Sequence, residues 1–448
     1  MKKMYRIMLL LVCAAVAFLA VSCGKGDGAS SGSNVKVEDK NFGGRKVTWI
    51  SQNGVGAKED SPTYQQEMAF LKEMETKYNC TLEFQAAGDY HAFVSTLTSM
   101  AMSGQKYADL IWAPTENTFP KFMLNDLFAP VDDYFDFTED FWNAEYNDAF
   151  IVNGKHYGIT NWKNPAGWVI YFNKRLCAEN GITDTQLYEL QAKGEWTWAK
   201  LEEFARQCTK TAKGEWGFAS AGGCWAYPWP FIYANGTTPV IREGNNFKYN
   251  LNTPAAIEAI EFMHKLVEES KVVPTEKSEY GYSDGLFKSG KIAFLNDETY
   301  NMSLIAEALK NDKFGVLLIP KGPKAEDYVN SSGAPSFVVM QPMTEDKDIL
   351  AKLASDYIRP KDWQEVKSQA DMYKPYYCDD QSYETLKMME TRSKTRYESA
   401  CTWFKQNVLW TNWGINDKIP ARTFVEQNQA ASQSALDEMW SKDMEVSE

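Results

Sequence analysis

The sequence predicts an α/β fold divided between two lobes. Strands alternate with helices between residues 46 and 112, a pattern typical of a sheet with helices packed on it. A chain of 448 residues is also too long for one comfortable core. A polar, turn-rich gap at residues 161–167 separates two extended runs. We interpret this gap as a crossing between lobes; an ordinary loop within one large domain is the alternative.

The composition is typical of a soluble globular protein with an acidic surface. Hydrophobic residues make up 44% of the chain and charged residues 24%, and the formal net charge is -13. Nucleic acid is therefore a poor partner, because it attracts basic surfaces. The 15 Trp residues are more than a core usually requires, so some of these rings are expected to serve a surface.

The N-terminus predicts export and a lipid anchor. Residues 1–6 are basic, and the apolar run at residues 7–20 is too short for a confident membrane span. The end of that run, residues 19–23, resembles a bacterial lipobox, in which Cys23 is acylated and becomes the new N-terminus. We therefore expect a signal peptide at residues 1–22 and a flexible Gly/Ser-rich tether at residues 23–41. A plain signal peptide with an incidental Cys is the alternative.

The cysteines do not predict a metal site. Cys13 lies in the expected signal peptide and Cys23 is the expected lipid attachment, which leaves six others: Cys80, Cys177, Cys208, Cys224, Cys378 and Cys401. None of them has the spacing of a metal-binding motif. Disulfides and scattered buried thiols are both open, and the sequence does not reveal a pairing.

The first lobe is predicted from alternating strands and helices. The expected elements are a strand at 46–51, a helix at 62–78, a strand at 81–84, a helix at 92–103 and a strand at 108–112. This alternation favours a parallel sheet, whose ligands bind beyond the carboxyl ends of the strands. The loops at 52–54, 87–90 and 112–117 are therefore expected to carry binding residues. They contain Gln52, Asn53, Asp89, Trp112, Glu116 and Asn117.

A hairpin precedes the crossing. Asn153-Gly154 is a two-residue turn signal between extended runs, because both residues tolerate positive φ. A buried strand at 168–172 follows the crossing. A second small-residue gap at 331–335, before a strand at 336–340, is the expected return crossing.

The second lobe is predicted to mix helices, strands and an aromatic loop. The expected elements are a helix starting near Thr197, a strand at 214–220, an aromatic loop at 222–231, a helix at 254–267, a strand ending in a polar loop at 292–298 and a strand at 314–323. From residue 346 onward the chain is expected to be mostly helical. That region contains a Trp-rich segment, in which Trp410 and Trp413 are expected to bind ligand, and an amphipathic end at 424–440.

A set of motifs in a fixed order carries a family resemblance. After the lipobox come 107–110 before Trp112, 153–159 followed by 170–174 and 181–182, 196–198 with 203–204, 287–293, and 319–323. This ordered set resembles the extracellular solute-binding proteins of ABC importers, in the group that contains the maltodextrin-binding proteins. The resemblance covers nearly all of the chain after the signal peptide.

The resemblance implies a two-lobed periplasmic-binding-protein-like fold of type II. Each lobe would be a β-sheet flanked by helices, with the ligand in a cleft between lobes and then delivered to ABC permease subunits in the membrane. The N-terminal lobe would comprise residues 42–160 and about 335–380. The C-terminal lobe would comprise residues 161–334 and about 381–448.

The resemblance also implies ligand-binding positions. Gln52, Asn53, Trp112, Glu116, Asn161, Trp162 and Lys163 match family positions that touch ligand. Trp225 and Trp229 are placed by their loop alone. Asp297, Glu298 and Tyr300 lie in a loop that often carries a stacking ring, although relatives commonly read Gly-x-Trp there and this chain reads Asn296-Asp297-Glu298-Thr299-Tyr300.

Carbohydrate chemistry favours the same residues independently of the resemblance. A pyranose offers an apolar face that stacks on a flat ring and a rim of hydroxyls that both donate and accept hydrogen bonds. Trp112, Trp162, Trp168, Trp225 and Trp229 can supply rings, and the Asn, Gln, Asp and Glu residues in the same loops can supply hydrogen bonds. The alternative for each Trp is a ring that only packs.

A secreted enzyme and a surface adhesin are the alternatives to a sugar receptor. A secreted glycosidase would need two carboxylates, and the candidates are Asp132-Asp133, Glu139-Asp140 and Asp297-Glu298. Adjacent acidic residues in loops are usually solvated, and no Gly-x-Ser-x-Gly or paired-His motif is present. A surface adhesin would explain the anchor but not two crossings. A peptide, a polyamine or a metal complex are alternative ligands.

The sequence therefore predicts a binding protein and not an enzyme. We expect a monomeric receptor outside the cytoplasm, lipid-anchored to the bacterial membrane, that closes on a mono- or oligosaccharide and requires neither a cofactor nor a metal. Residues 160–163 are expected both to bend and to line the cleft. The identity of the sugar and the division of the Trp residues between stacking and packing are left open.

Overall fold

The structure is a computed structural model. It describes residues 40–52, 64–139, 142, 144–160, 167–221, 227–277, 279, 281–310, 312–332, 335–359, 361, 368–377, 379–411 and 413–442. The expected signal peptide, Cys23 and residues 23–39 of the tether lie outside these residues, as do residues 161–166 of the first expected crossing and residues 333–334 of the return crossing. Across the described part of the chain, no helix combines the length and apolarity needed to span a membrane.

The first sheet has four strands in the order β11-β3-β1-β2. They are β1 (Lys46–Ser51), β2 (Thr81–Ala86), β3 (Leu110–Pro114) and β11 (Ser336–Val339). β1 runs parallel to β2 and β3, which confirms the parallel sheet expected here, and β11 joins antiparallel to β3 with Val338 opposite Trp112. A strand about 220 residues later in the chain therefore completes the first sheet.

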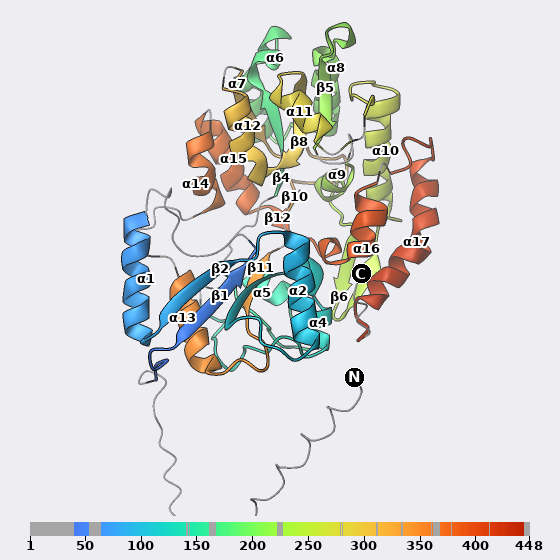
Figure 1. Cartoon of the computed structure of the whole chain (residues 1–448). Helices are drawn as coiled ribbons and strands as arrows, with labels where there is room; N and C mark the ends of the chain where they lie inside the picture. The colour runs from blue at the N-terminus through green and yellow to red at the C-terminus, as the bar shows by residue number, and fades with distance from the viewer. Residues whose placement is uncertain are drawn as a thin grey trace, which may run out of the picture. The chain divides into compact units, whose positions relative to one another are not determined.

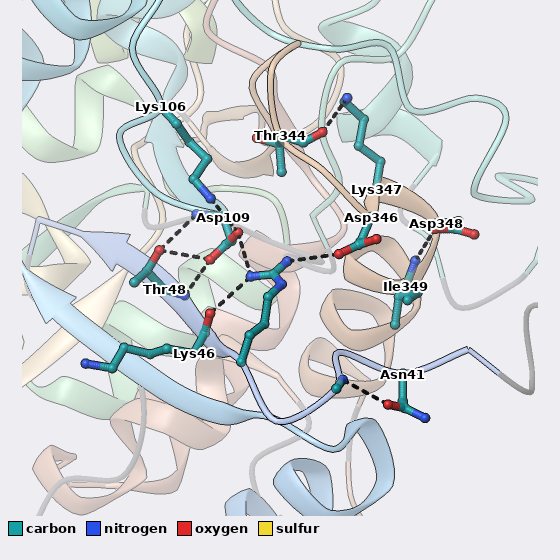
Figure 2. Close-up of polar contacts among 12 residues, drawn as sticks. Asn41, Lys46, Thr48, Lys106, Asp109, Thr344, Asp346, Lys347, Asp348 and Ile349 are labelled. Atoms are coloured by element: carbon teal, nitrogen blue, oxygen red, sulfur yellow. Dashed lines mark hydrogen bonds and ion pairs between the residues drawn. The ribbon is translucent and has the colours of Figure 1, made fainter. Parts of the chain in front are cut away.

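Buried charge fixes the start of this sheet. Asp109 precedes β3, and its carboxylate accepts hydrogen bonds from the Thr48 amide at 2.8 Å and the Thr48 hydroxyl at 3.1 Å (Figure 2). Lys106 and Arg45 also pair with it, at 3.0 and 3.1 Å. Burial acts to raise the pKa of Asp109, but the Thr48 amide and the two cations together lower it. The carboxylate therefore ties β1 to β3 at one register.

Helices cover the first sheet, as Figure 1 shows. They are α1 (Tyr64–Tyr78), α2 (Tyr90–Met102), α3 (Thr115–Thr118), α4 (Lys121–Leu124), α5 (Ala144–Ala149) and α13 (Lys347–Ile358). Side chains of β1 alternate between faces: Trp49 packs in a cluster that includes Leu350 of α13, whereas Ile50 packs in a cluster with Phe93 of α2. The sheet is thus buried on both faces. We call this sheet with its helices the first lobe.

The second sheet also has four strands, in the order β5-β8-β4-β9. They are β4 (Trp168–Asn173), β5 (Trp216–Ser220), β8 (Ile292–Glu298) and β9 (Phe314–Leu317). β5 is parallel to β8, but β4 is antiparallel to both β8 and β9. The second sheet is therefore mixed: β5 and β8 are parallel, and β4 is antiparallel to both of its neighbours.

Helices connect the strands of the second sheet along the chain, and side chains cap the first two of them. They are α6 (Lys174–Glu179), α7 (Asp184–Ala192), α8 (Trp198–Cys208), α9 (Trp229–Ala234), α10 (Pro254–Glu268), α11 (Tyr282–Lys288) and α12 (Met302–Ala308). Thr183 caps α7 by accepting the Gln186 amide at 3.1 Å, and Pro254 opens α10 at the position where its missing N–H costs nothing. We call this sheet with these helices the second lobe.

The remaining elements follow in the C-terminal third or lie in short hairpins. They are β6 (Val240–Glu243), β7 (Asn246–Tyr249), β10 (Asn330–Ser331), β12 (Ser393–Lys394), α14 (Gln369–Tyr373), α15 (Asp380–Glu390), α16 (Thr402–Phe404), α17 (Ala421–Glu438), the 3-10 helices η2 (Thr211–Lys213), η3 (Thr299–Asn301), η4 (Lys374–Tyr376) and η5 (Glu398–Ala400), and a π-helical turn at Lys405–Leu409. β10 pairs with β12, and β6 pairs with β7.

The structure corrects two local predictions. The aromatic loop expected at 222–231 is interrupted, because α9 begins at Trp229 and buries that ring. The polar loop expected at 296–298 is instead the end of β8, and Asn296 and Asp297 are buried. The Asn153-Gly154 turn is confirmed by positive φ at both residues, 52° and 74°, although its arms meet only in the single bridge Val152↔Lys155.

Candidate functional site

A buried arginine contacts charged and aromatic side chains at the end of the second sheet. Arg396 precedes η5, and its Nε donates to Glu398 at 3.2 Å while one terminal nitrogen lies 3.6 Å from Glu298. Its guanidinium carbon stands 3.9 Å from the centroid of the Trp229 ring, which is a cation–π contact. We call Arg396, Glu298, Glu398, Trp168, Trp229 and Tyr233 the Arg396 cluster.

Hydrogen bonds hold both carboxylates of the cluster. The Trp168 indole donates to Glu298 at 2.7 Å, and the Tyr233 hydroxyl donates to Glu398 at 2.8 Å. Burial raises the pKa of Glu298, although Arg396 and the Trp168 donor act against that shift. Burial likewise acts to lower the pKa of Arg396, but Glu398 and Glu298 more than offset it. The pairing therefore keeps the guanidinium charged in a dry environment.

The first lobe faces this cluster with a carboxylate. Glu116 lies in α3, directly after β3, and pairs with Lys405 at 3.0 Å. Its charge contributes to the pKa shifts of both Glu298 and Arg396, so groups from the two lobes act on one another. The side chains of Glu116 and Glu298 are 30% and 22% exposed, which leaves both open to a ligand.

A hydrogen-bonded chain lies beside the Glu116–Lys405 pair. The Asn117 side-chain amide donates to the Tyr90 hydroxyl at 2.5 Å and accepts from the Thr402 hydroxyl at 3.2 Å. Tyr90 begins α2, after β2, and Thr402 begins α16. The carboxyl ends of β2 and β3 are therefore linked to the segment that carries Lys405.

Trp residues near the site differ sharply in exposure. Trp410 is 53% exposed, and the Lys405 ammonium lies 4.8 Å from its ring centroid. Trp413 and Trp229 are 0% and 2% exposed, so neither presents a free face in this structure. Among these three rings, Trp410 alone offers a flat surface on which a ligand can stack.

Other predicted residues occupy varied positions. Gln52 is half-buried just after β1, Asp89 caps α2 by accepting the Ala92 amide at 2.9 Å, and half-buried Trp112 lies in β3 with its ring stacked on Trp49. Tyr300 is in η3 and exposed. Asn53, Asn161, Trp162, Lys163 and Trp225 lie outside the described residues.

Asp297 is a buried structural carboxyl in this structure. It accepts hydrogen bonds from the Asn301 side chain at 3.0 Å and from the Glu298 amide at 2.7 Å. Burial, followed by the nearby Asp284, raises its pKa well above the usual range. Its neighbour Glu298 points instead to Arg396, because successive side chains of a strand face opposite sides.

The sequence predicted Glu116 and Glu298 but not the basic residues that pair with them, nor Glu398 and Tyr233. Arg396, Glu398 and Lys405 come from a stretch without clear periodicity, and Tyr233 comes from a helix that was not predicted. The only available signal was the charge alternation in Arg396-Tyr397-Glu398, which is weak. Tyr90 was within a loop expected to bind, but was not singled out.

A separate hollow of about 440 Å³ lies elsewhere, lined by Asp148, Ile151, Gly154, Arg242, Gly244, Asn245 and Tyr397. Arg242 donates to the carbonyl oxygens of Ala149, Ile151 and Gly244. Because Arg242 donates to these backbone carbonyl groups, it links the β6–β7 turn to the C-terminal end of α5 and the residues after it. The hollow contains none of the Arg396 cluster.

The arrangement can bind without performing chemistry of its own. Carboxylates and a partly exposed ring converge with cations that are already paired, a combination suited to a ligand rich in hydroxyls. Across the described residues, no group of three or more His, Cys, Asp or Glu side chains could hold a metal ion. The fold and this site together define a class of receptor that holds a small solute.

Sequence comparison places the chain within that class. Residues 57–342 match the family described as bacterial extracellular solute-binding protein, and the chain belongs to this family. The family is extracellular and consists of solute-binding proteins rather than enzymes. A binding protein of Brucella abortus strain 2308 is 24% identical over 263 residues. That match covers 57% of this chain and 59% of the relative, so the chain matches less than two thirds of the relative's length.

Solved structures of receptors share the fold at low sequence identity. An ABC substrate-binding protein of Listeria monocytogenes, in complex with cycloalternan, is 16% identical with a TM-score of 0.62, over 88% of this chain and 99% of that one. The galacto-N-biose-/lacto-N-biose I-binding protein of Bifidobacterium longum is 13% identical with a TM-score of 0.64, over 89% and 99%. UgpB of Mycobacterium tuberculosis, in complex with glycerophosphocholine, is 15% identical with a TM-score of 0.63, over 88% and 98%. These likenesses confirm the two-lobed type II fold.

Proposed function

We propose that this protein is the substrate-binding protein of an ABC importer and that it captures a neutral mono- or oligosaccharide. The observation that carries this proposal is the convergence of Glu116, Glu298 and Arg396 with the exposed ring of Trp410, in a chain of the solute-binding family. Several structural neighbours, including the Listeria and Bifidobacterium receptors, were solved with sugars. UgpB shares the fold with a different ligand, so the fold alone does not select a sugar.

The charge balance favours a neutral ligand. Two cations, Arg396 and Lys405, are paired with three carboxylates, Glu298, Glu398 and Glu116. An anionic solute would have to displace an existing pair and meet surplus negative charge at short range. A sugar hydroxyl can instead donate to Glu116 or Glu298 without disturbing either pair.

Capture would proceed by closure of the two lobes around the ligand. In this proposal the N-terminal lobe comprises 42–160 and about 335–380, the C-terminal lobe comprises the rest, and the chain bends at 160–163 and 331–335. Closure is driven only by contacts that exist in the closed state. The Glu116–Lys405 pair is a candidate for such a contact, because Glu116 follows β3 and Lys405 lies in the C-terminal segment.

Transport would follow from recognition of the closed form by the permease. A lipid on Cys23 and a tether at 23–41 would keep a monomeric receptor near the membrane without restricting closure. No reaction on the ligand is required, so incubation with a sugar that binds should return that sugar unaltered. Detection of cleavage products would favour the secreted glycosidase considered from the sequence.

Thermal-shift screening tests the proposal directly. A ligand that binds only the folded protein raises the unfolding temperature in proportion to its affinity and concentration. A panel should include neutral mono- and oligosaccharides, uronic acids, short peptides and glycerophosphodiesters. The proposal requires a shift with at least one neutral sugar. A shift only with a peptide or a charged solute would contradict it.

A further inference from the structure

The ammonium group of Lys405 lies between a carboxylate and an aromatic ring. Its nitrogen is 3.0 Å from a carboxylate oxygen of Glu116 and lies over the Trp410 ring, 4.8 Å from the ring centroid. The Lys405 side chain is 8% exposed, whereas that of Glu116 is 30% exposed and Trp410 is 53% exposed. The cation is therefore buried between two groups that a solute can reach.

A carboxylate beside an aromatic face binds a primary ammonium well. The carboxylate accepts an N–H from the cation, and the face of an indole ring attracts a cation within about 6 Å of its centroid. Glu116 belongs to α3 in the first lobe, whereas Trp410 ends the π-helical turn in the C-terminal segment. The fold thus assembles an ammonium-binding position from distant parts of the sequence, and the chain's own Lys405 occupies it.

The π-helical turn brings Lys405 and Trp410 to the same side of the backbone. The Trp410 amide donates to the Lys405 carbonyl oxygen at 2.9 Å, a hydrogen bond that reaches five residues back along the chain. In an α-helix, residues five positions apart point about 140° away from one another, because each residue turns by about 100°. The wider π-helical turn reduces this angle, so the ammonium meets the ring. The contact therefore depends on the backbone of this turn and not only on side-chain rotamers.

Contacts of Trp413 hold the same turn in place. The Trp413 ring is fully buried, and its indole N–H donates to the Leu409 carbonyl oxygen at 3.2 Å. The Trp413 carbonyl oxygen accepts a hydrogen bond from Nε2 of His264 in α10 at 3.0 Å. Neither contact involves the Lys405 side chain, so shortening that side chain should leave Trp410 in place.

We propose that Lys405 is a specificity-determining residue, whose ammonium fills the position formed by Glu116 and Trp410 and keeps amine-bearing solutes out of it. The excluded class comprises primary amines, such as amino sugars and alkylamines. A ligand amine would have to displace Lys405 from Glu116 or approach its positive charge at short range. This inference rests on the proposed function for the identification of the ligand site, and it adds a reason why neutral hydroxyls are accepted there.

Rescue with a small amine tests the ammonium-binding position directly. Lys405→Ala removes every side-chain atom beyond Cβ, and those atoms correspond to n-propylammonium. This cation should stabilise the variant saturably, raising its unfolding temperature by about 2 °C at about ten times its Kd. Wild-type protein should show no such rise, because its own lysine occupies the position. Sodium chloride at equal concentration controls for ionic strength, and n-propanol controls for the apolar stem.

Removal of the carboxylate supplies the matched control. In a double variant that carries Lys405→Ala and Glu116→Gln, the vacated space and the Trp410 ring remain but the negative charge is gone. The stabilisation by n-propylammonium should therefore largely disappear. Equal stabilisation of the single and double variants, equal stabilisation of the wild type, or no response of a folded Lys405→Ala variant would overturn the inference.

Lys405→Met provides a second route, because it keeps an apolar stem and removes the charge. Calorimetry should compare a neutral sugar identified by thermal-shift screening with the amino sugars of the same carbon skeleton. Relative to the wild type, at least one amino sugar should gain about tenfold in affinity over the neutral sugar, and no gain would contradict the inference. The two proposals fail separately. Wild-type protein that binds no neutral sugar removes the proposed function, whereas the n-propylammonium result decides the role of Lys405 on its own.

Discussion

Trp410 is predicted to stack on the ligand, and its truncation should weaken binding without unfolding the protein. The side chain is 53% exposed, so of roughly 250 Å² of Trp surface about 130 Å² is free. A sugar ring that covers half of this area buries about 65 Å², worth about 1.6 kcal/mol at the usual coefficient. Trp410→Ala should therefore raise the Kd by roughly tenfold.

The assay is titration calorimetry with a sugar identified by thermal-shift screening, together with the unfolding temperature of each variant. Trp403→Ala is the matched control, because Trp403 is a partly exposed ring of the same segment, whereas the Lys405 ammonium lies over the ring of Trp410. Trp410→Phe keeps a flat ring and should retain most of the affinity. If Trp410→Ala folds normally and its Kd stays within twofold of the wild type, the stacking argument is wrong.

Three further substitutions test the energetics of the fold and the site. Arg396→Met leaves Glu298 and Glu398 without their buried cation and should lower the free energy of unfolding, measured by chemical denaturation, by about 3–5 kcal/mol. A triple variant that also carries Glu298→Gln and Glu398→Gln should recover most of that loss. If the single variant is as stable as the wild type, the pairing does not stabilise the fold. Although burial acts to raise the pKa of Glu202, Lys265, Ser270 and Arg206 lower it to about 2, so its folded form binds protons more weakly than the unfolded chain. Because the two cations are partly exposed and screened by solvent, this carboxylate should add only about 2 kcal/mol to the free energy of unfolding above pH 4.5. That contribution should disappear as the pH falls toward 2, and Glu202→Gln should flatten this part of the pH–stability curve. Gly217→Ala would place a Cβ 2.0 Å from the Ala205 carbonyl oxygen, and should cost about 3 kcal/mol or prevent folding, whereas Gly285→Ala, where the space is open, should be tolerated.

Much of the fold could be predicted because local signals agree with it. The α10 helix begins at Pro254 and carries a regular apolar face, and the strand β4 is hydrophobic from Trp168 to Phe172, as expected for a strand buried on both faces. The small-residue gap before 336–339 correctly marked a new strand. The gap could not predict which strand β11 pairs with, because its antiparallel pairing with β3 depends on residues far apart in the sequence.

The candidate site was less predictable because its contacts are long-range. Glu298 is paired with a residue about 100 positions later, and Arg396 has no local pattern that marks it as buried. Every residue of β8 except the last is buried, so alternation could not tell which carboxyl faces the cluster. Trp410 and Trp413 are only three positions apart, yet the first is exposed and the second fully buried, a difference that packing on Phe424 decides.

Titration calorimetry of the purified protein against matched neutral and acidic sugars tests the central claim most directly. Each neutral mono- or oligosaccharide should be paired with the uronic acid that differs from it by one carboxylate. Because the cations beside Glu116 and Glu298 are already paired, the account predicts saturable binding of at least one neutral sugar and at least tenfold weaker binding of its acidic counterpart. Tighter binding of the acid, or binding of no neutral sugar, would contradict the account.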